Sequence, residues 1–160
     1  MAKIKKSLNA SLVFHIFKIN ETLQKNGDML TKDYGITTQQ WLILLYLAND
    51  PNIIYLQENP QEKPLLAKEL ADAMNVSRAN ITNLINVLLE KGLIAQAFDK
   101  HDRRRKRLLL TKAGDEIIKK LEIIRQVGND KLLADFSKEE KLKFIEFIQK
   151  CLEVLKRDFK

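Results

Sequence analysis

The segment at residues 66–92, LAKELADAMNVSRANITNLINVLLEKG, constrains the fold of this chain most strongly. Its apolar residues recur at helical spacing on both sides of a short polar turn, which predicts two helices packed against each other. Ala71 offers a small side chain where the helices cross, and Asn75 tolerates the left-handed backbone of a tight turn. Ser77 can cap the second helix, which is predicted at residues 77–91, so the segment reads as a helix-turn-helix. The side chains expected to pack between the two helices are Leu70, Met74, Ile81, Leu84 and Leu88.

The exposed face of the second helix is polar and basic, and it carries no carboxylate before Glu90. Acidic residues are normally favoured near a helix N-terminus, so their absence argues against an ordinary solvated face. Arg, Asn and Thr side chains reach base edges and phosphates in the major groove, and the free N–H groups of a helix N-terminus suit phosphate. We therefore predict that this helix is a recognition helix for double-stranded DNA. Its predicted contacts are Ser77, Arg78, Asn80, Thr82, Asn83 and Asn86.

A strongly basic run, HDRRRKR at residues 101–107, leads directly into three leucines. The leucines fit a strand rooted in a core, whereas arginine is rarely fully buried unless it is paired. Short strands are predicted at residues 93–98 and 107–110, which makes a hairpin, or wing, beside the helix-turn-helix. An arginine inserted in the minor groove of DNA is stabilised by the negative potential of the groove. Asp102 is expected to pair with a neighbouring arginine and hold the loop's shape. The alternative is a flexible basic loop without a role in DNA binding. The predicted wing contacts are Lys100, Arg103, Arg104, Arg105 and Lys106.

Helical periodicity extends over most of the remaining chain. Apolar residues at steps of three and four predict a helix within residues 1–30 and two closing helices within 112–160. Thr37, with Gln40 three residues later, forms a capping box for another helix. The predicted fold class is mainly α with a small β-hairpin wing. It is a winged helix-turn-helix domain at residues 37–111, flanked by N- and C-terminal dimerisation helices.

Residues 50–65 interrupt this pattern as an extended connection that holds all three prolines of the chain. A short helical turn is expected at residues 53–57, IIYLQ. Three roles stay open for this connection at the level of sequence: it contacts DNA, it covers a pocket, or it has no functional role.

The terminal helices have broader apolar faces than packing on one or two neighbours requires. A two-fold dimer places two recognition helices about one helical turn of DNA apart, so the symmetry of the protein matches that of its target. We therefore expect a homodimer formed through residues 1–30 and 112–160. The alternative is a monomer with a long helical tail.

The charge of the chain favours an anionic partner. Lys and Arg number 28 against 21 Asp and Glu, which gives a formal net charge of +7. An architectural protein without sequence preference, or an RNA-binding protein, would use the same charge. The groove-reading side chains of the predicted helix argue against the first, and its lack of aromatic residues for base stacking argues against the second.

Enzymatic function is not expected, because the chain has two histidines, one cysteine and no glycine-rich phosphate loop. No cofactor and no metal are predicted. No window approaches the ~20 apolar residues of a membrane span, and polar residues interrupt the first helix too often for a signal peptide. The single cysteine fits a reducing compartment, so a cytoplasmic protein without membrane contact is expected.

The order of helices, helix-turn-helix, wing and closing helices resembles the MarR (multiple antibiotic resistance regulator) family of winged-helix transcription regulators. LAKELADAMNVSRANITNLINVLLEKGLI and DKHDRRRKRLLLTKAG carry the resemblance, in which Asp99, Asp102, Arg103 and Arg104 fall where the family has its wing signature. The resemblance implies a homodimeric repressor on a pseudo-palindromic operator. It also implies that Asp99 and Asp102 organise the wing and that Arg104 enters the minor groove. The connection at 51–64 is longer than the family usually has.

The resemblance further implies a small aromatic or carboxylate effector. It would be held between the dimer helices and the winged helix-turn-helix domain at residues 37–111, which we call the reading head. Phe14, His15 and Trp41 are candidate lining residues, but the alternative is stronger for each: Phe14 and Trp41 are more often core residues, and a lone histidine such as His15 on an amphipathic helix is usually structural. Cys151 lies on an apolar helical face, so we expect a buried, inert thiol and not an oxidation sensor.

Overall fold

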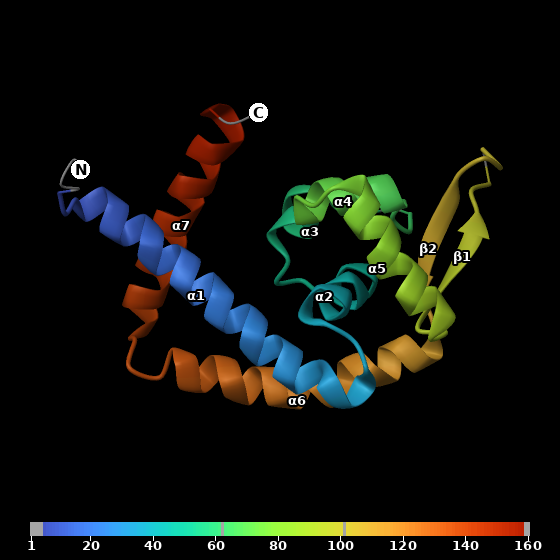
Figure 1. The fold of residues 1–160 in the computed structure, drawn as a ribbon, viewed down its shortest axis with the longest axis horizontal. Helices are drawn as coiled ribbons and strands as arrows, with labels where there is room; N and C mark the ends of the chain where they lie inside the picture. The colour runs from blue at the N-terminus through green and yellow to red at the C-terminus, as the bar shows by residue number, and fades with distance from the viewer. Residues whose placement is uncertain (1–4, 62, 101, 159–160) are drawn as a thin grey trace. The chain divides into compact units, whose positions relative to one another are not determined.

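The computed structural model describes residues 5–61, 63–100 and 102–158 (Figure 1). The chain forms two compact units, residues 1–121 and residues 122–160. Its described elements are mainly helical with one antiparallel hairpin, so the predicted fold class is confirmed. In chain order they are α1 (Leu8–Thr31), the 3-10 helix η1 (Lys32–Tyr34), α2 (Thr38–Leu47), α3 (Ile54–Glu58), α4 (Ala67–Met74), α5 (Arg78–Glu90), β1 (Ile94–Phe98), β2 (Lys106–Leu110), α6 (Lys112–Leu132) and α7 (Lys138–Asp158).

The core of the first unit lies among α2, α4, α5 and the hairpin. Aliphatic side chains from these elements are wholly or almost wholly buried. Burial of a Leu or Ile side chain contributes about 1.5–3 kcal/mol, which makes this cluster the main source of stability of the unit. One face of α5 packs on the core, and the opposite face of this helix is exposed to solvent. The largest fully buried hydrophobic side chains of the core are Ile43, Leu44, Leu70, Ile81, Leu88, Leu108 and, from α6, Leu121.

The helix-turn-helix forms as the sequence predicts. Asn75 ends α4 in the left-handed region, with φ +52°, and the Val76 N–H donates to the Ala71 carbonyl across the turn at 3.1 Å. The Ser77 hydroxyl accepts from the Asn80 N–H at 3.2 Å, which caps α5. Of the side chains expected between the helices, Met74 and Leu84 are only half-buried. Ile85, which is not among the side chains predicted to pack there, is buried.

The hairpin follows α5 after Gly92, whose φ of +66° turns the chain back. The strands pair from Ile94 with Leu110 to Phe98 with Lys106. The predicted boundaries are each wrong by one residue at the first position. Leu93 is not in β1, because its N–H closes the end of α5 on the Leu88 carbonyl, and Lys106 belongs to β2.

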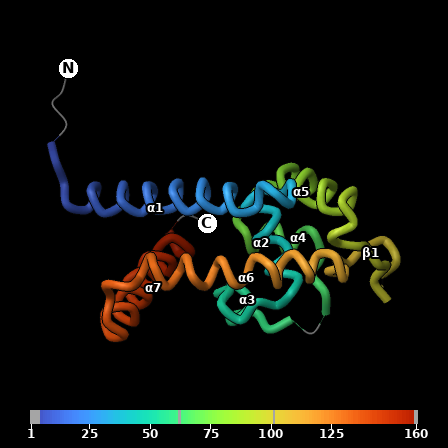
Figure 2. Tube along the Cα trace, turned by 90° about the horizontal axis from the view of Figure 1, so that it is seen from below, coloured from blue at the N-terminus to red at the C-terminus, as the bar shows by residue number. Residues whose placement is uncertain are grey.

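The C-terminal end of α1 is fastened to the start of α2. The Thr38 N–H and hydroxyl both donate to the Asp28 carboxylate, at 2.7 and 2.8 Å. The helices approach so closely that a Cβ on Gly27 would lie 2.3 Å from the Thr38 hydroxyl oxygen. The predicted capping box of Thr37 and Gln40 is present at the same point. The N-terminal part of α1 extends away from α2 as a long straight helix (Figure 2).

The second unit comprises the end of α6 and all of α7, and none of the described residues of α7 is buried. The expectation of a buried Cys151 is wrong for the single chain, in which this thiol is exposed. Its face of α7 is apolar, as the periodicity predicts, but none of the residues described on this helix is buried. None of the described helices combines the length and the apolar character that a membrane crossing demands.

Candidate nucleic-acid interface

One face of α5 is free of the core and carries most of the DNA contacts predicted for the recognition helix. Its first turn holds no acidic residue. Thr82 donates its hydroxyl to the Arg78 carbonyl at 2.7 Å, so only the oxygen lone pairs and the methyl group face outward. Asn80 differs from the rest because it is half-buried, which reduces its access to a base edge. The exposed members of the predicted set are Ser77, Arg78, Thr82, Asn83 and Asn86.

Tyr46 joins α2 to α4. Its hydroxyl donates to the Ala73 carbonyl at 3.2 Å. Burial, with a smaller contribution from Tyr55, raises the pKa of Tyr46 above its usual value. The hydrogen bond from Tyr46 to Ala73 helps to fix α4 and the turn that leads into α5.

The wing tip is organised around Asp102, as predicted. Its carboxylate pairs with the Nε atoms of Arg104 and Arg105, each at 3.2 Å, and accepts from the Arg104 N–H at 3.0 Å. The Arg105 N–H closes the turn on the Asp102 carbonyl at 2.9 Å. Arg104 is 92% exposed, so its guanidinium projects outward even while Nε faces the carboxylate. Exposed pairs of this kind contribute little to stability, and their effect here is to direct the arginines.

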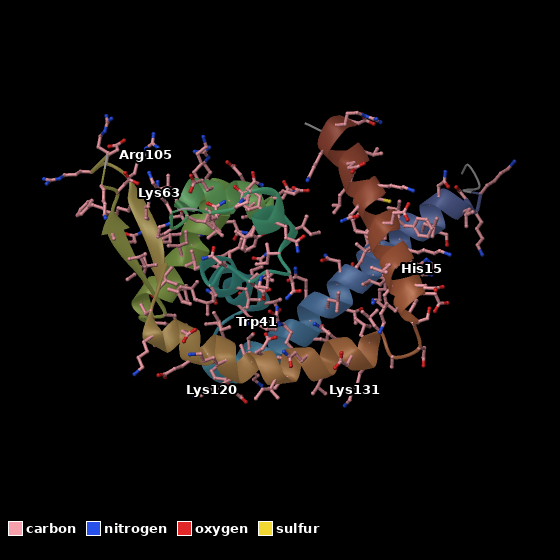
Figure 3. All side chains as sticks on the ribbon, turned by 180° about the vertical axis from the view of Figure 1, so that it is seen from behind. His15, Trp41, Lys63, Arg105, Lys120 and Lys131 are labelled. Carbon is pink, nitrogen blue, oxygen red and sulfur yellow. The ribbon has the colours of Figure 1, made fainter. Side chains whose placement is uncertain are left out.

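The remaining basic residues of the wing are less uniform than the sequence suggested. Lys100 and Arg103 are exposed. The Lys106 ammonium lies over the Phe98 ring, 5.9 Å from its centroid, at the end of the hairpin. His101 lies outside the described residues. Figure 3 shows Arg105 at the far end of the hairpin, where the cationic groups project from the body of the unit.

Sequence reasoning missed Arg107, which it took only as the start of a strand. The structure places its guanidinium in an ion pair with Asp99, a residue expected to organise the wing. The signal available in the sequence was the strand period: Leu108 points into the core, so Arg107 has to lie on the opposite face of the hairpin. That period does not reveal a partner in a distant segment.

The three candidate effector residues do not come together within one chain. Trp41 is 7% exposed in the core, whereas Phe14 is 70% exposed on α1. His15 lies beside Phe14, with its Nδ1 2.6 Å from the Ser11 carbonyl oxygen. Figure 3 shows His15 and Trp41 well separated. Among the described residues, no group of three or more His, Cys, Asp or Glu side chains is gathered as a metal site.

Comparison with known proteins gives a consistent result. The profile described as MarR family matches residues 34–105. The transcriptional activatory protein BadR of Rhodopseudomonas palustris is 29% identical over 159 residues, which cover 98% of this chain and 85% of that protein. The uncharacterised HTH-type transcriptional regulator YwoH of Bacillus subtilis is 24% identical over 146 residues, 91% of this chain and 97% of that protein.

Solved structures share the fold. The S. aureus MepR–DNA complex superposes with a TM-score of 0.76 at 23% identity, covering 93% of this chain and 99% of that one. The transcriptional regulator SlyA gives a TM-score of 0.77 at 20% identity, over 92% and 95% of the two chains. At these identities the likeness establishes a shared winged-helix architecture.

Proposed function

Because the chain belongs to the MarR family of winged-helix transcription regulators, we propose that it is a homodimeric repressor of a pseudo-palindromic operator. Its named relatives are transcriptional regulators, and the chain is accordingly a DNA-binding regulator and not an enzyme. The observation that carries the operator proposal is the exposed, carboxylate-free start of α5 on the same unit as an outward-pointing arginine tip.

In the proposed complex, α5 lies in the major groove and the wing follows the adjacent minor groove. Arg78 and Asn83 are exposed and have the donors and acceptors that read base edges. Arg104 is the proposed minor-groove residue, because its exposed guanidinium is directed outward by Asp102. Ser77, Lys100, Arg103 and Arg105 are proposed to contact phosphates, which give affinity and register without reading sequence.

The proposed dimer is supported by the apolar surface of the terminal helices. Large aliphatic and aromatic side chains along α1, α6 and α7 are more than a third exposed. Exposed apolar side chains in this number are typical of an interaction site, and a second copy would cover them. Residues 1–30 and 112–160 are therefore proposed as the dimerisation region. The exposed set includes Leu8, Leu12, Phe14, Phe17, Ile123, Val127, Leu142, Ile145, Phe147 and Leu155.

Repression and its relief by an effector complete the proposal. The proposal of a small aromatic or carboxylate effector rests on the family resemblance. Phe14, His15 and Trp41 stay predictions for the residues that line its site. BadR is named an activatory protein, so the sign of regulation needs its own test. That test is a reporter gene fused to the operator, once the operator has been identified by the fragment selection described below. Higher reporter output in cells lacking this protein is expected for a repressor, and lower output would show an activator.

The test of the proposed function is selection of bound fragments from sheared genomic DNA at physiological salt. A few enriched fragments that share an inverted repeat are expected, with half-sites about one helical turn apart. Uniform recovery of fragments would contradict the proposal and favour a protein that binds DNA through charge alone.

A further inference from the structure

The base of the wing carries a charged contact that the proposed DNA interface does not use. Arg107 lies on β2 and pairs with Asp99, which follows β1. The Asp99 side chain is 7% exposed and that of Arg107 is 18% exposed. Both charges are therefore largely withdrawn from solvent and from DNA, unlike the exposed arginines of the tip.

The guanidinium of Arg107 also reaches a segment far away in the sequence. Its Nη1 donates to the Pro64 carbonyl at 2.5 Å. The main chain reinforces this junction, because the Leu108 N–H donates to the Leu65 carbonyl at 2.9 Å and Leu66 forms a bridge with Arg107. The end of the extended connection thus runs along β2, and Figure 3 shows Lys63 beside the hairpin.

From Asp99 the contacts continue towards the tip. One carboxylate oxygen of Asp99 takes the Arg107 guanidinium, and the other accepts from the Asp102 N–H at 3.2 Å. The Asp99 N–H donates to the Arg105 carbonyl at 2.9 Å. Asp102 in turn holds Arg104 and Arg105. A continuous polar path therefore joins the connection at Pro64 to the cationic tip.

We propose that Arg107 is a positioning residue for the DNA-contacting wing, which it fixes to the connection by joining Asp99 to the Pro64 carbonyl. Arginine suits this role because its planar fork donates in two directions at once, whereas lysine presents a single ammonium. The inference rests on the proposed function of the wing. It also gives the long connection a role that the sequence left open: its last residues form part of the support of the wing.

The test is a double-mutant cycle between Arg107→Gln and Arg104→Ala, measured as the Kd for the operator recovered by fragment selection. In the otherwise unchanged protein, Arg104→Ala is expected to weaken binding by about tenfold. In the Arg107→Gln background the same change is expected to weaken binding by less than about threefold, because the tip is no longer held in place. A tenfold loss in both backgrounds would overturn the proposal, since Arg107 would then act independently of the tip.

Two further variants keep the cycle interpretable. Arg107→Lys keeps the charge beside Asp99 without the two-directional fork, and an intermediate coupling to Arg104 is expected. Should Arg107→Gln fail to fold in thermal unfolding, the Arg107→Lys cycle replaces it, and full additivity there overturns the proposal. Lys120→Ala is the matched control, because it removes an exposed positive charge on α6, far from the wing, and its effect should add to that of Arg104→Ala.

Hydrogen exchange of the free protein gives a readout that does not depend on DNA. Faster exchange of the Asp99, Asp102 and Arg105 amides is expected in Arg107→Gln, with the α5 amides unchanged. Uniformly faster exchange across the first unit would mean that Arg107 only stabilises the fold, which contradicts a positioning role. Failure of the protein to prefer its operator, by contrast, counts against the proposed function before the cycle is begun.

Discussion

The reading head and the terminal helices use the same kinds of apolar residue in opposite ways. In the head, Ile43, Leu44 and Leu88 are completely buried. On the terminal helices, Leu8 is 75% exposed and Phe14 is 70% exposed. The head completes its core within one chain, whereas the terminal helices present an apolar surface that one chain leaves open. Stability of the head should therefore be a property of the single chain, and order in the terminal helices a property of the assembly.

The largest effect is expected from breaking the closed core of the head. Leu88→Ala should lower the free energy of unfolding by about 2–5 kcal/mol, because it leaves a cavity where α5 meets the core. Chemical denaturation followed by circular dichroism measures the loss. Lys120→Ala, on the exposed side of α6, should change stability by less than ~0.5 kcal/mol. A Leu88 variant as stable as this control would contradict the account of the core.

The next effect tests the open surface of the terminal helices. Phe14→Asp should raise the Kd of the dimer by about 30-fold or more, because it places a charge in the proposed interface. Light scattering over a range of protein concentrations measures the mass. Lys25→Ala, exposed on the same helix, is the control and should leave the dimer intact. If the wild-type protein is a monomer at micromolar concentration, the proposal that the terminal helices form a dimer interface is contradicted.

Within the head, the exposed side of α5 should govern sequence discrimination. Arg78→Ala and Asn83→Ala should each reduce the preference for operator over random DNA by about 1–3 kcal/mol, if each contacts a base edge. Asn80→Ala should reduce it less, because Asn80 is half-buried. Competition binding with both duplexes measures the preference. Equal losses on operator and random DNA would assign these residues to phosphate contacts instead.

The wing should contribute affinity with a salt-dependent signature. Arg104→Ala should weaken operator binding and lower the slope of log K against log salt by about one, because it removes one cationic contact. Titrations at several salt concentrations give the slope. An unchanged slope would place Arg104 away from the DNA.

The smallest expected effect concerns the cap that starts α5. Ser77→Ala should cost about 1 kcal/mol of stability, because the Asn80 N–H loses its acceptor. Thr82→Ala is the comparison, since its hydroxyl donates to the Arg78 carbonyl within the same helix and should matter less. Thermal unfolding of both variants measures the difference, and a larger loss in Thr82→Ala would contradict the capping role.

Features set by local chemistry were predictable from the sequence. Asn75 at the turn, the caps of Thr37 and Ser77, and the pairing of Asp102 each depend on residues within a few positions. These local signals agree with one another, so the sequence predicted the helix-turn-helix and the hairpin with boundaries close to those observed.

Contacts between distant segments were not predictable in the same way. Arg107 and Pro64 are 43 positions apart, and nothing in either local pattern indicates their hydrogen bond. The half-burial of Asn80 depends on how α5 sits on the core, and the exposure of Cys151 depends on what covers α7. Phe14 and His15 lie on α1, where helical periodicity alone does not decide which side chains are buried, and Phe14 is 70% exposed in the single chain.

The central claim is that this reading head distinguishes one DNA sequence from others. The most direct measurement is the Kd of the purified protein for the recovered operator and for a scrambled duplex of equal length and composition, at physiological salt. The account predicts that the operator binds at least about a thousandfold more tightly, as specific regulators do. Equal affinity for the two duplexes would contradict it and would show that the +7 charge of the chain, and not α5, determines binding.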